Sequence, residues 1–268
     1  SDIEINLFFV SEIARLIVVS NNLLGISVAG YLLSFSTPYL DNLVIDSNSF
    51  SNIGTIGSYH IEAQKCDTIL INNNTVQNSN PENPFISISC DAIDTGVTLQ
   101  NSHFINITQS SRKRILQGLN LIAVTTKMDS NSGSNQIALM NNVFKNITVS
   151  VEEGFTKNVL ENSFIFVMSI DSSLILKDNT FDEISITPQG NIFTISIPTI
   201  YFNDTKFSNF KYWDVNGAFN MIFYNLSISN CSFESNSGFN SNGAGLMKFS
   251  NPSPDTNALN VLVENCTF

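Results

Sequence analysis

The sequence predicts an all-β protein made of stacked repeats. One eight-residue phrase returns nine times, first as LIVVSNNL at 16–23 and last as VLVENCTF at 261–268. Its final residue, here called the anchor, falls at positions 23, 50, 76, 104, 144, 181, 207, 233 and 268, in steps of 27, 26, 28, 40, 37, 26, 26 and 35 residues. A recurrent period in this range is typical of solenoids, in which each repeat adds one coil.

The first half of every phrase predicts a β-strand with one buried face. The residues seven and five positions before the anchor are apolar in all nine phrases, as Leu174 and Leu176 are before Phe181. Alternation with a period of two is typical of a strand. Because such short strands cannot bury their apolar face alone, we expect each to pair with its counterpart one repeat later, about 4.8 Å away.

Polar turn residues follow each strand. The positions three and two before the anchor are mostly Asn, as in Asn141 and Asn142. Asn tolerates left-handed backbone conformations, and stacked Asn side chains can bond from one coil to the next. The anchor and the residue three positions beyond it, such as Phe144 and Ile147, are predicted to return to the interior.

A second strand is predicted in the other half of each coil. Phe164 imitates an anchor but lies only 17 residues before Phe181, too few for a coil, so it belongs to a second strand. The predicted second strands span 31–36, 85–89, 121–124, 164–170, 192–197, 219–224 and 245–250. Polar insertions within 110–114, 127–136, 151–158, 234–243 and 250–257 are predicted to form exposed loops.

The repeated phrase, hydrophobic-x-hydrophobic-x-Asn-Asn/Ser-x-Phe-x-Asn-Ile, resembles that of right-handed parallel β-helix proteins with the pectin-lyase-like fold. The resemblance covers about residues 10–268. It implies one β-helix domain over 1–268, with about nine coils of 26–28 residues and loop insertions, either complete or part of a longer solenoid. The right hand follows from the resemblance and from the crossover rule for parallel strands. The Asn-rich and Phe-rich composition is also similar to large surface proteins of protists.

The charge and hydropathy of the chain exclude some partners. Its net charge is −11 and its isoelectric point is near 4.4, which argues against a nucleic-acid partner because phosphate binding needs a basic surface. The apolar segment 13–35 suggests a membrane span, but Arg15 and Asn21 interrupt it and it carries the repeat in phase, so no span is predicted. The chain begins with Ser1, so we expect a mature chain or a piece of a longer one.

Four cysteines predict two disulfides. Cys231 and Cys266 occupy the same repeat position in consecutive coils, and Cys66 and Cys90 lie 24 residues apart, close to one coil. This pairing suggests an oxidising compartment, so the chain is expected to be secreted or at the cell surface. The alternative is a stack of free interior thiols, since in-register parallel strands are poorly placed for a disulfide. Cys66–Cys90 is therefore the stronger pair. No metal or cofactor site is predicted.

Seven asparagines lie in Asn-x-Ser/Thr sequons and are predicted glycosylation sites. Four should point outward, because they lie two after, or four or eight before, an anchor: Asn106, Asn146, Asn203 and Asn225. The other three lie in the turn, three before an anchor, and could carry no glycan if that column formed an internal ladder: Asn73, Asn230 and Asn265.

No catalytic residue is predicted, and the chain is not expected to be an enzyme. Asp178 and Asp204 share a repeat position in adjacent coils and should lie about 5 Å apart, a separation that suits a retaining glycosidase. Both aspartates simply replace Asn in the turn, however. The other paired acids are Asp91/Asp94, Glu152/Glu153 and Asp178/Asp182, and the signatures of pectin-degrading enzymes are absent.

The sequence therefore favours an extracellular structural glycoprotein, a stacking subunit or segment of a fibre or surface coat. Neither end shows a cap, so coils are expected to continue, either by end-to-end association of copies or in a longer chain. The alternative is a carbohydrate-binding module or adhesin, in which Tyr201, Tyr212 and Trp213 would be exposed. A polysaccharide lyase or hydrolase is the third reading.

Overall fold

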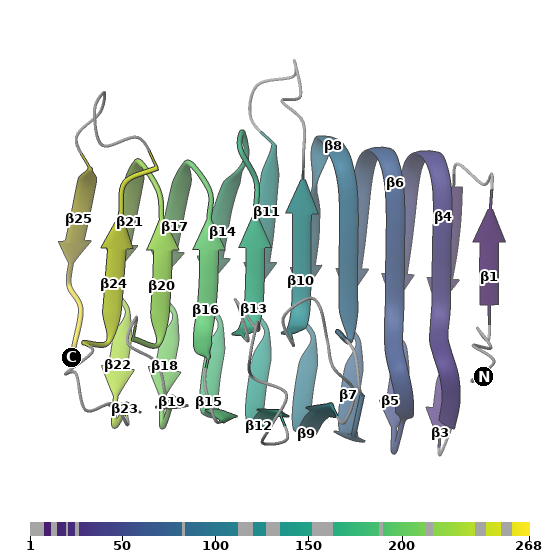
Figure 1. The fold of residues 1–268 in the computed structure, drawn as a ribbon, viewed down its shortest axis with the longest axis horizontal. Coiled ribbons are helices and arrows are strands. Elements are labelled where there is room, and N and C mark those ends of the chain that lie inside the picture. Colours follow the sequence, from purple (N-terminus) through teal and green to yellow (C-terminus); the bar gives the residue numbers. More distant parts are fainter. Residues whose placement is uncertain are drawn as a thin grey trace.

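The computed structural model describes residues 8–11, 15–19, 21–24, 27–81, 84–111, 120–126, 135–151, 163–187, 190–212, 217–238, 245–252 and 259–268. Within these residues the secondary structure is β throughout, and neighbouring strands pair in parallel with the strands of the next coil. The strands lie on three faces, named A, B and C in the order in which the chain crosses them. The predicted all-β parallel solenoid is confirmed (Figure 1).

Face A is formed by the strands at the front of Figure 1. In the long strands β4 and β6 and in β8, the chain runs from face A around a corner into face B without a break. The strands of face A are β1 (Phe8–Ser11), the first parts of β4 (Ser27–Asp46), β6 (Gly54–Asn72) and β8 (Ile86–Gln100), β10 (Asn120–Thr126), β13 (Ser163–Met168), β16 (Asn191–Ser196), β20 (Phe219–Ile222) and β24 (Met247–Ser250).

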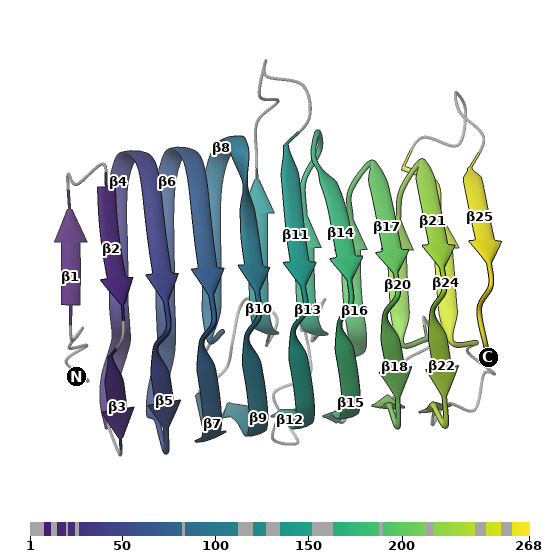
Figure 2. The same ribbon diagram turned by 180° about the vertical axis from the view of Figure 1, so that it is seen from behind.

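Face B lies behind face A and is seen from outside in Figure 2. The first half of each of the nine phrases forms one of its strands. These are β2 (Arg15–Val19), the second parts of β4, β6 and β8, β11 (Gln136–Met140), β14 (Ser173–Lys177), β17 (Thr199–Asn203), β21 (Asn225–Ser229) and β25 (Asn260–Glu264). In Figure 1 the chain runs up face A in front and down face B behind while it advances from right to left, so the solenoid is right-handed.

Face C contains the anchors. Its strands are β3 (Asn22–Leu24), β5 (Ser49–Ser51), β7 (Thr75–Ser79), β9 (His103–Ser111), β12 (Val143–Val151), β15 (Thr180–Thr187), β18 (Lys206–Ser208), β19 (Lys211–Tyr212), β22 (Ser232–Glu234) and β23 (Ser237–Gly238). The sequence analysis predicted two strands in each coil and missed this third one. It also missed the face A segment of β6 around His60 and Glu62.

The third strand was missed because its alternation is broken by one residue. In β12, Phe144 and Ile147 both point inward, three positions apart, and Val149 follows with normal alternation. Asn146, between them, has φ 51°. This left-handed residue rotates the strand, so the inward spacing is three rather than two and the period of a strand is hidden.

Left-handed residues form two columns along the solenoid. Apart from glycine, every described residue with positive φ lies either three before or two after an anchor. The first column makes the corner between faces B and C, and the second bends face C. They are Ser47, Asn73, Asn101, Asn141, Asp178, Asp204, Asn230 and Asn265 in the first column, and Asn52, Asn78, Asn106, Asn146, Glu183, Asn209 and Ser235 in the second.

The internal polar ladder lies one residue away from the first of these columns. Asn142, two before its anchor, is fully buried, and its amide donates to the Oδ1 of Asn179 in the next coil (3.0 Å) and to the backbone oxygen of Leu99 in the preceding one (2.9 Å). The same position continues the ladder with Asn48, Asn74, Ser102, Asn179 and Thr205. Asn73, Asn230 and Asn265, in the neighbouring column, are exposed and are not part of the ladder.

Anchor phenylalanines stack along the interior of face C. Phe144 and Phe181 are parallel with ring centroids 4.8 Å apart, and Phe207 and Phe233 repeat the arrangement at 4.8 Å. Phenylalanines of face A meet this stack edge-on, as Phe164 does against Phe144 at 5.4 Å. Stacked and edge-on pairs both suit the charge distribution of aromatic rings. The core is therefore one continuous column of rings and branched aliphatic side chains.

We predict that Asn142→Leu lowers the free energy of unfolding by about 3 kcal/mol, because the Leu99 oxygen and the Ser102 amide each lose a buried partner. Asn141→Gly, at the adjacent exposed position with φ 54°, should change it by less than about 0.5 kcal/mol, since glycine adopts this conformation freely. Urea unfolding followed by circular dichroism measures both. Equal effects of the two variants would contradict the ladder's role.

Candidate functional site

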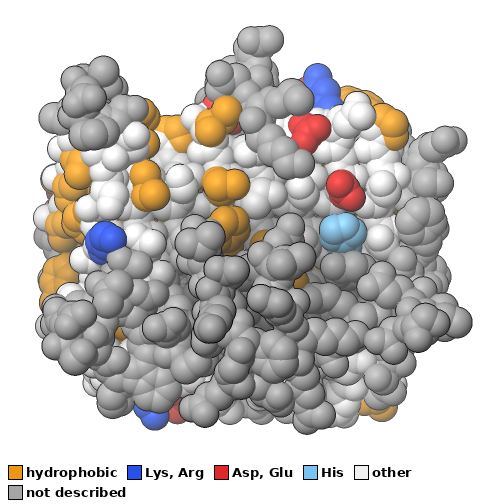
Figure 3. Space-filling model, in the orientation of Figure 1, with side chains coloured by type: hydrophobic (Ala, Val, Ile, Leu, Met, Phe, Trp, Pro, Cys, Tyr) orange, Lys and Arg blue, Asp and Glu red, His pale blue; other side chains and the backbone are white. Residues whose placement is uncertain are grey.

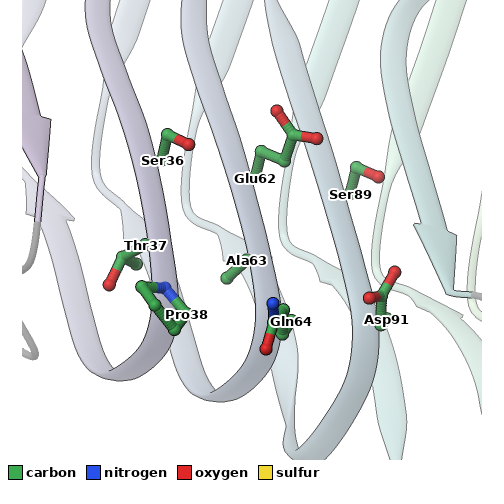
Figure 4. A pocket seen from close by; sticks show the side chains of 8 residues that line it. All are labelled: Ser36, Thr37, Pro38, Glu62, Ala63, Gln64, Ser89 and Asp91. Atoms are coloured by element: carbon green, nitrogen blue, oxygen red, sulfur yellow. The ribbon is translucent and has the colours of Figure 1, made fainter.

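A shallow pocket of about 380 Å³ opens on face A, across β4, β6 and β8. Figure 4 shows its lining side chains on three neighbouring strands, with the carboxyl groups of Glu62 and Asp91 on either side of Ser89. The lining residues are Ser36, Thr37, Pro38, Glu62, Ala63, Gln64, Ser89 and Asp91.

The parallel register builds this pocket. Ser36, Glu62 and Ser89 are direct partners in adjacent strands, so they form one outward row across three coils. Outward residues of neighbouring coils are separated by the strand spacing of about 4.8 Å. Leu33 and Phe35 alternate with this row toward the core and are buried. The pocket is therefore a row of polar groups on a rigid sheet.

The pocket is acidic. Its two charged lining residues are Glu62 and Asp91, and the side chain of Glu62 is 62% exposed. Nearby, Lys65 is paired with Asp94 at 2.6 Å, and the hydrogen bond to Asp94 raises the pKa of Lys65. On the outer side of the sheet, Figure 3 shows acidic side chains and a histidine close together on this part of face A.

His60 lies 3.9 Å from Glu62, measured from Nε2 to the carboxylate. Burial lowers the pKa of His60, although the charge of Glu62 acts in the opposite direction. The neutral ring is thus favoured at neutral pH. The surface then offers carboxylate acceptors, hydroxyls and an amide, with a neutral imidazole beside them. This chemistry suits a ligand rich in hydroxyl groups or one that carries an amine, and disfavours a polyanion.

The carboxylates that the sequence places in pairs lie in different surroundings in the part of the chain that the structure describes. Asp178 and Asp204 are exposed left-handed turn residues, with φ 54° and 50°, like the asparagines of their column. The carboxyl group of Asp182 is partly buried, and this burial raises its pKa. Hydrogen bonds from Asn209 and Ser208 and the charge of Lys145 act in the opposite direction, and the net pKa of Asp182 is lowered. Glu152 and Glu153 lie outside the described residues. No three described His, Cys, Asp or Glu residues are grouped to bind a metal.

One of the two predicted disulfides is present. Cys66 and Cys90 are bonded between β6 and β8, with their Cα atoms 6.0 Å apart. The prediction of a second disulfide is wrong, since Cys231 and Cys266 are free thiols. They occupy the ladder position of Asn142, and the Cys266 thiol contacts the oxygen of Ile228 in the preceding coil (3.7 Å), as the Asn142 amide contacts Leu99.

Burial raises the pKa of Cys231 to about 11, so this thiol is protonated and unreactive at neutral pH. The free pair therefore extends the polar ladder with weaker donors. The alternative noted from the sequence, a stack of interior thiols, describes Cys231 well because it is buried. Cys266 is only partly buried.

Six of the seven sequon asparagines are exposed, and the seventh, Asn203, is half-buried. Asn146 donates to the Oδ1 of Asn106 at 2.9 Å, so these two sequons lie side by side in adjacent coils. The seven positions are Asn73, Asn106, Asn146, Asn203, Asn225, Asn230 and Asn265. Five of them fall in the two left-handed columns: Asn73, Asn106, Asn146, Asn230 and Asn265.

Other predicted features have mixed outcomes. Tyr201 is exposed, but Tyr212 is buried at 4% exposure, and Trp213 lies outside the described residues. The described parts of the apolar segment 13–35 are strands. Among the described residues no helix has the length and apolar character needed to cross a membrane.

Sequence reasoning missed most of the pocket. Glu62 and Gln64 were missed because the strand that carries them was not predicted, and Ser36 and Ser89 looked like ordinary outward positions. The usable signal was the alternation of Tyr59, Ile61 and Ala63, which are all buried. The polar residues between them, His60 and Glu62, concealed this alternation, although Glu62 lines the pocket.

We predict that reducing the Cys66–Cys90 disulfide lowers the free energy of unfolding by about 3 kcal/mol, since the bond closes a loop of 24 residues in the unfolded chain. Thermal unfolding with and without a reducing agent measures this. In the Cys66→Ala/Cys90→Ala variant, the reducing agent should have no effect. If the reducing agent lowered the unfolding temperature of that variant as well, the loss of stability would have to come from another group.

Comparison with known proteins found no family model, curated protein or solved structure that matches the chain.

Proposed function

We propose that this chain is an extracellular structural glycoprotein, a stacking subunit or a segment of a fibre or surface coat. One observation carries the proposal: in the interior, side chains of the same type stack on one another from coil to coil. The Asn ladder and the Phe stack both run along the axis. Each coil thereby offers the next one an equivalent surface, as a rod that is extended by coils requires.

The surface of the last coil supports this proposal. Val261 and Val263 occupy the inward-facing positions of β25, in register with the buried Leu226 and Ile228, yet each is 44% exposed. Phe268 stacks on Phe233 with ring centroids 5.0 Å apart, yet it is 71% exposed. An equivalent coil packed against β25 would bury all three side chains and continue the parallel pairing of face B. The proposal is that coils stack in this way, within one chain or between copies.

The Cys66–Cys90 disulfide and the exposed sequons support an extracellular location. Disulfides persist mainly in oxidising compartments. Asn73 and Asn265 are exposed and accessible to a glycan. Asn106 and Asn146 are hydrogen-bonded neighbours about one strand spacing apart, so glycans on both would collide.

Electron cryomicroscopy of the native material tests the proposal. We expect rods or filaments in which the strand spacing of about 4.8 Å continues past the length of this chain, with glycan density on outward asparagines. Intact-mass analysis should show Asn106 or Asn146 occupied, but never both on one molecule. Discrete particles with capped ends and unmodified asparagines would overturn the proposal.

A variant separates end-to-end stacking from other association. Val263→Lys places a charge in the exposed core column of β25, so it should abolish the end-to-end association of this chain in light scattering. Glu264→Lys, on the outward side of the same strand, is the matched control and should leave association intact.

The pocket on face A favours a second candidate function, a carbohydrate-binding module or adhesin. Its hydroxyls and carboxylates suit a neutral or amino sugar. A glycan array identifies the ligand, and Glu62→Gln should then weaken binding more than about tenfold, because a charged hydrogen bond is lost. Glu234→Gln on face C is the control. An array without any bound neutral or amino sugar would exclude this function.

A further inference from the structure

Face B carries an outward column that is aliphatic over much of its length. The register places its members opposite one another from coil to coil, and each lies at the centre of its strand. They are Ile17, Val44, Leu70, Thr98, Ala138, Ile175, Tyr201, Ser227 and Leu262. We name this set the outer column of face B.

Eight of the nine members of the outer column are exposed or partly exposed, and Ala138 is buried. Ile17 is 67%, Leu262 53% and Tyr201 40% exposed, and Ile175 and Leu70 are partly exposed. In Figure 2 the strands of face B lie side by side, and no described segment crosses them. Contiguous apolar surfaces of several hundred Å² are uncommon on monomers and mark interaction sites.

Charge is scarce around this column in a chain of net charge −11. The described flanking positions are mostly Asn, Ser, Thr and Gln, with charged residues at Arg15, Asp46, Lys177 and Glu264 only. Face C, by contrast, carries ion pairs such as Lys145–Asp182 and Lys206–Glu234 on its surface. Face B therefore carries few of the charges that keep exposed sheets apart.

We propose that the outer column of face B is a lateral interface between two copies of this chain, which pack side by side. Nine strands at about 4.8 Å and five residues at about 3.3 Å give a face of roughly 40 Å by 16 Å. Two such faces bury about 1,300 Å² in total, within the range of stable interfaces. A second copy presents a column of the same length and the same spacing.

Other occupants fit this column less well. Sugar rings pack against flat aromatic side chains, and Tyr201 is the one aromatic member of the column. An anionic membrane surface would call for many lysines and arginines at the flanks, where Arg15 and Lys177 are the two cationic residues among the described positions. Branched aliphatic side chains on a regular sheet are instead the surface on which two sheets pack face to face.

This interface is distinct from the end-to-end contact of the proposed function and does not depend on it. The end contact lengthens the rod, whereas the lateral contact doubles its cross-section. A glycan on Asn203 or Asn225, which flank the outer column, would cover it. The test therefore uses the chain produced without N-glycans.

Sedimentation equilibrium and small-angle X-ray scattering of the Val263→Lys chain test the proposal with the end contact disabled. We expect a concentration-dependent dimer whose mass is doubled while its longest dimension is nearly that of the monomer. Ile175→Lys, added to this chain, should weaken the dimer more than about tenfold. Thr180→Lys, in the same coil on face C, is the matched control and should leave it unchanged.

Tyr201→Lys gives a second, independent variant if Ile175→Lys lowers the melting temperature. The proposal is overturned if the Val263→Lys chain stays monomeric at high concentration, or if the face B and face C variants weaken the dimer equally. Loss of all association in Val263→Lys alone would show that only the end-to-end contact exists.

Discussion

The architecture depends on two left-handed residues in each of the seven described coils anchored from Phe50 to Phe233. One turns the chain from face B to face C, and the other bends face C so that the anchor and the residue three beyond it both enter the core. L-amino acids resist this conformation, and Asn and Asp tolerate it best after glycine. Ten of the fifteen described left-handed residues other than glycine are Asn, so the turns account for part of the high Asn content of the chain. Asp178 and Asp204 satisfy the same requirement.

The remaining features follow from these turns. Each turn places the next side chain, at the position of Asn142, inside the solenoid, where its amide bonds to the coils on both sides. The turn then places the anchor ring directly over the anchor of the preceding coil. Buried polar groups that are fully bonded fix a unique register, and the stacked rings supply the apolar contact.

The sequence was sufficient for the face B strands, the turn and the buried anchors, because alternation and Asn pairs are local signals. It failed at face C, where one left-handed residue such as Asn146 alters the inward spacing from two to three. It also failed at β6, where no strand was predicted around His60 and Glu62. The second disulfide was mispredicted because residues that share a column, such as Cys231 and Cys266, are not thereby oriented to bond.

The difference between the two neighbouring Asn positions also determines where the fold accepts an acid. Asn141 belongs to an exposed turn column in which Asp178 already carries a carboxylate. Replacing Asn by Asp in that column changes the charge and keeps the left-handed turn. At Asn142 the same replacement would remove the donor to Leu99 and place a carboxylate against a backbone oxygen inside the solenoid. The exposed column therefore tolerates acidic residues, whereas the ladder excludes them.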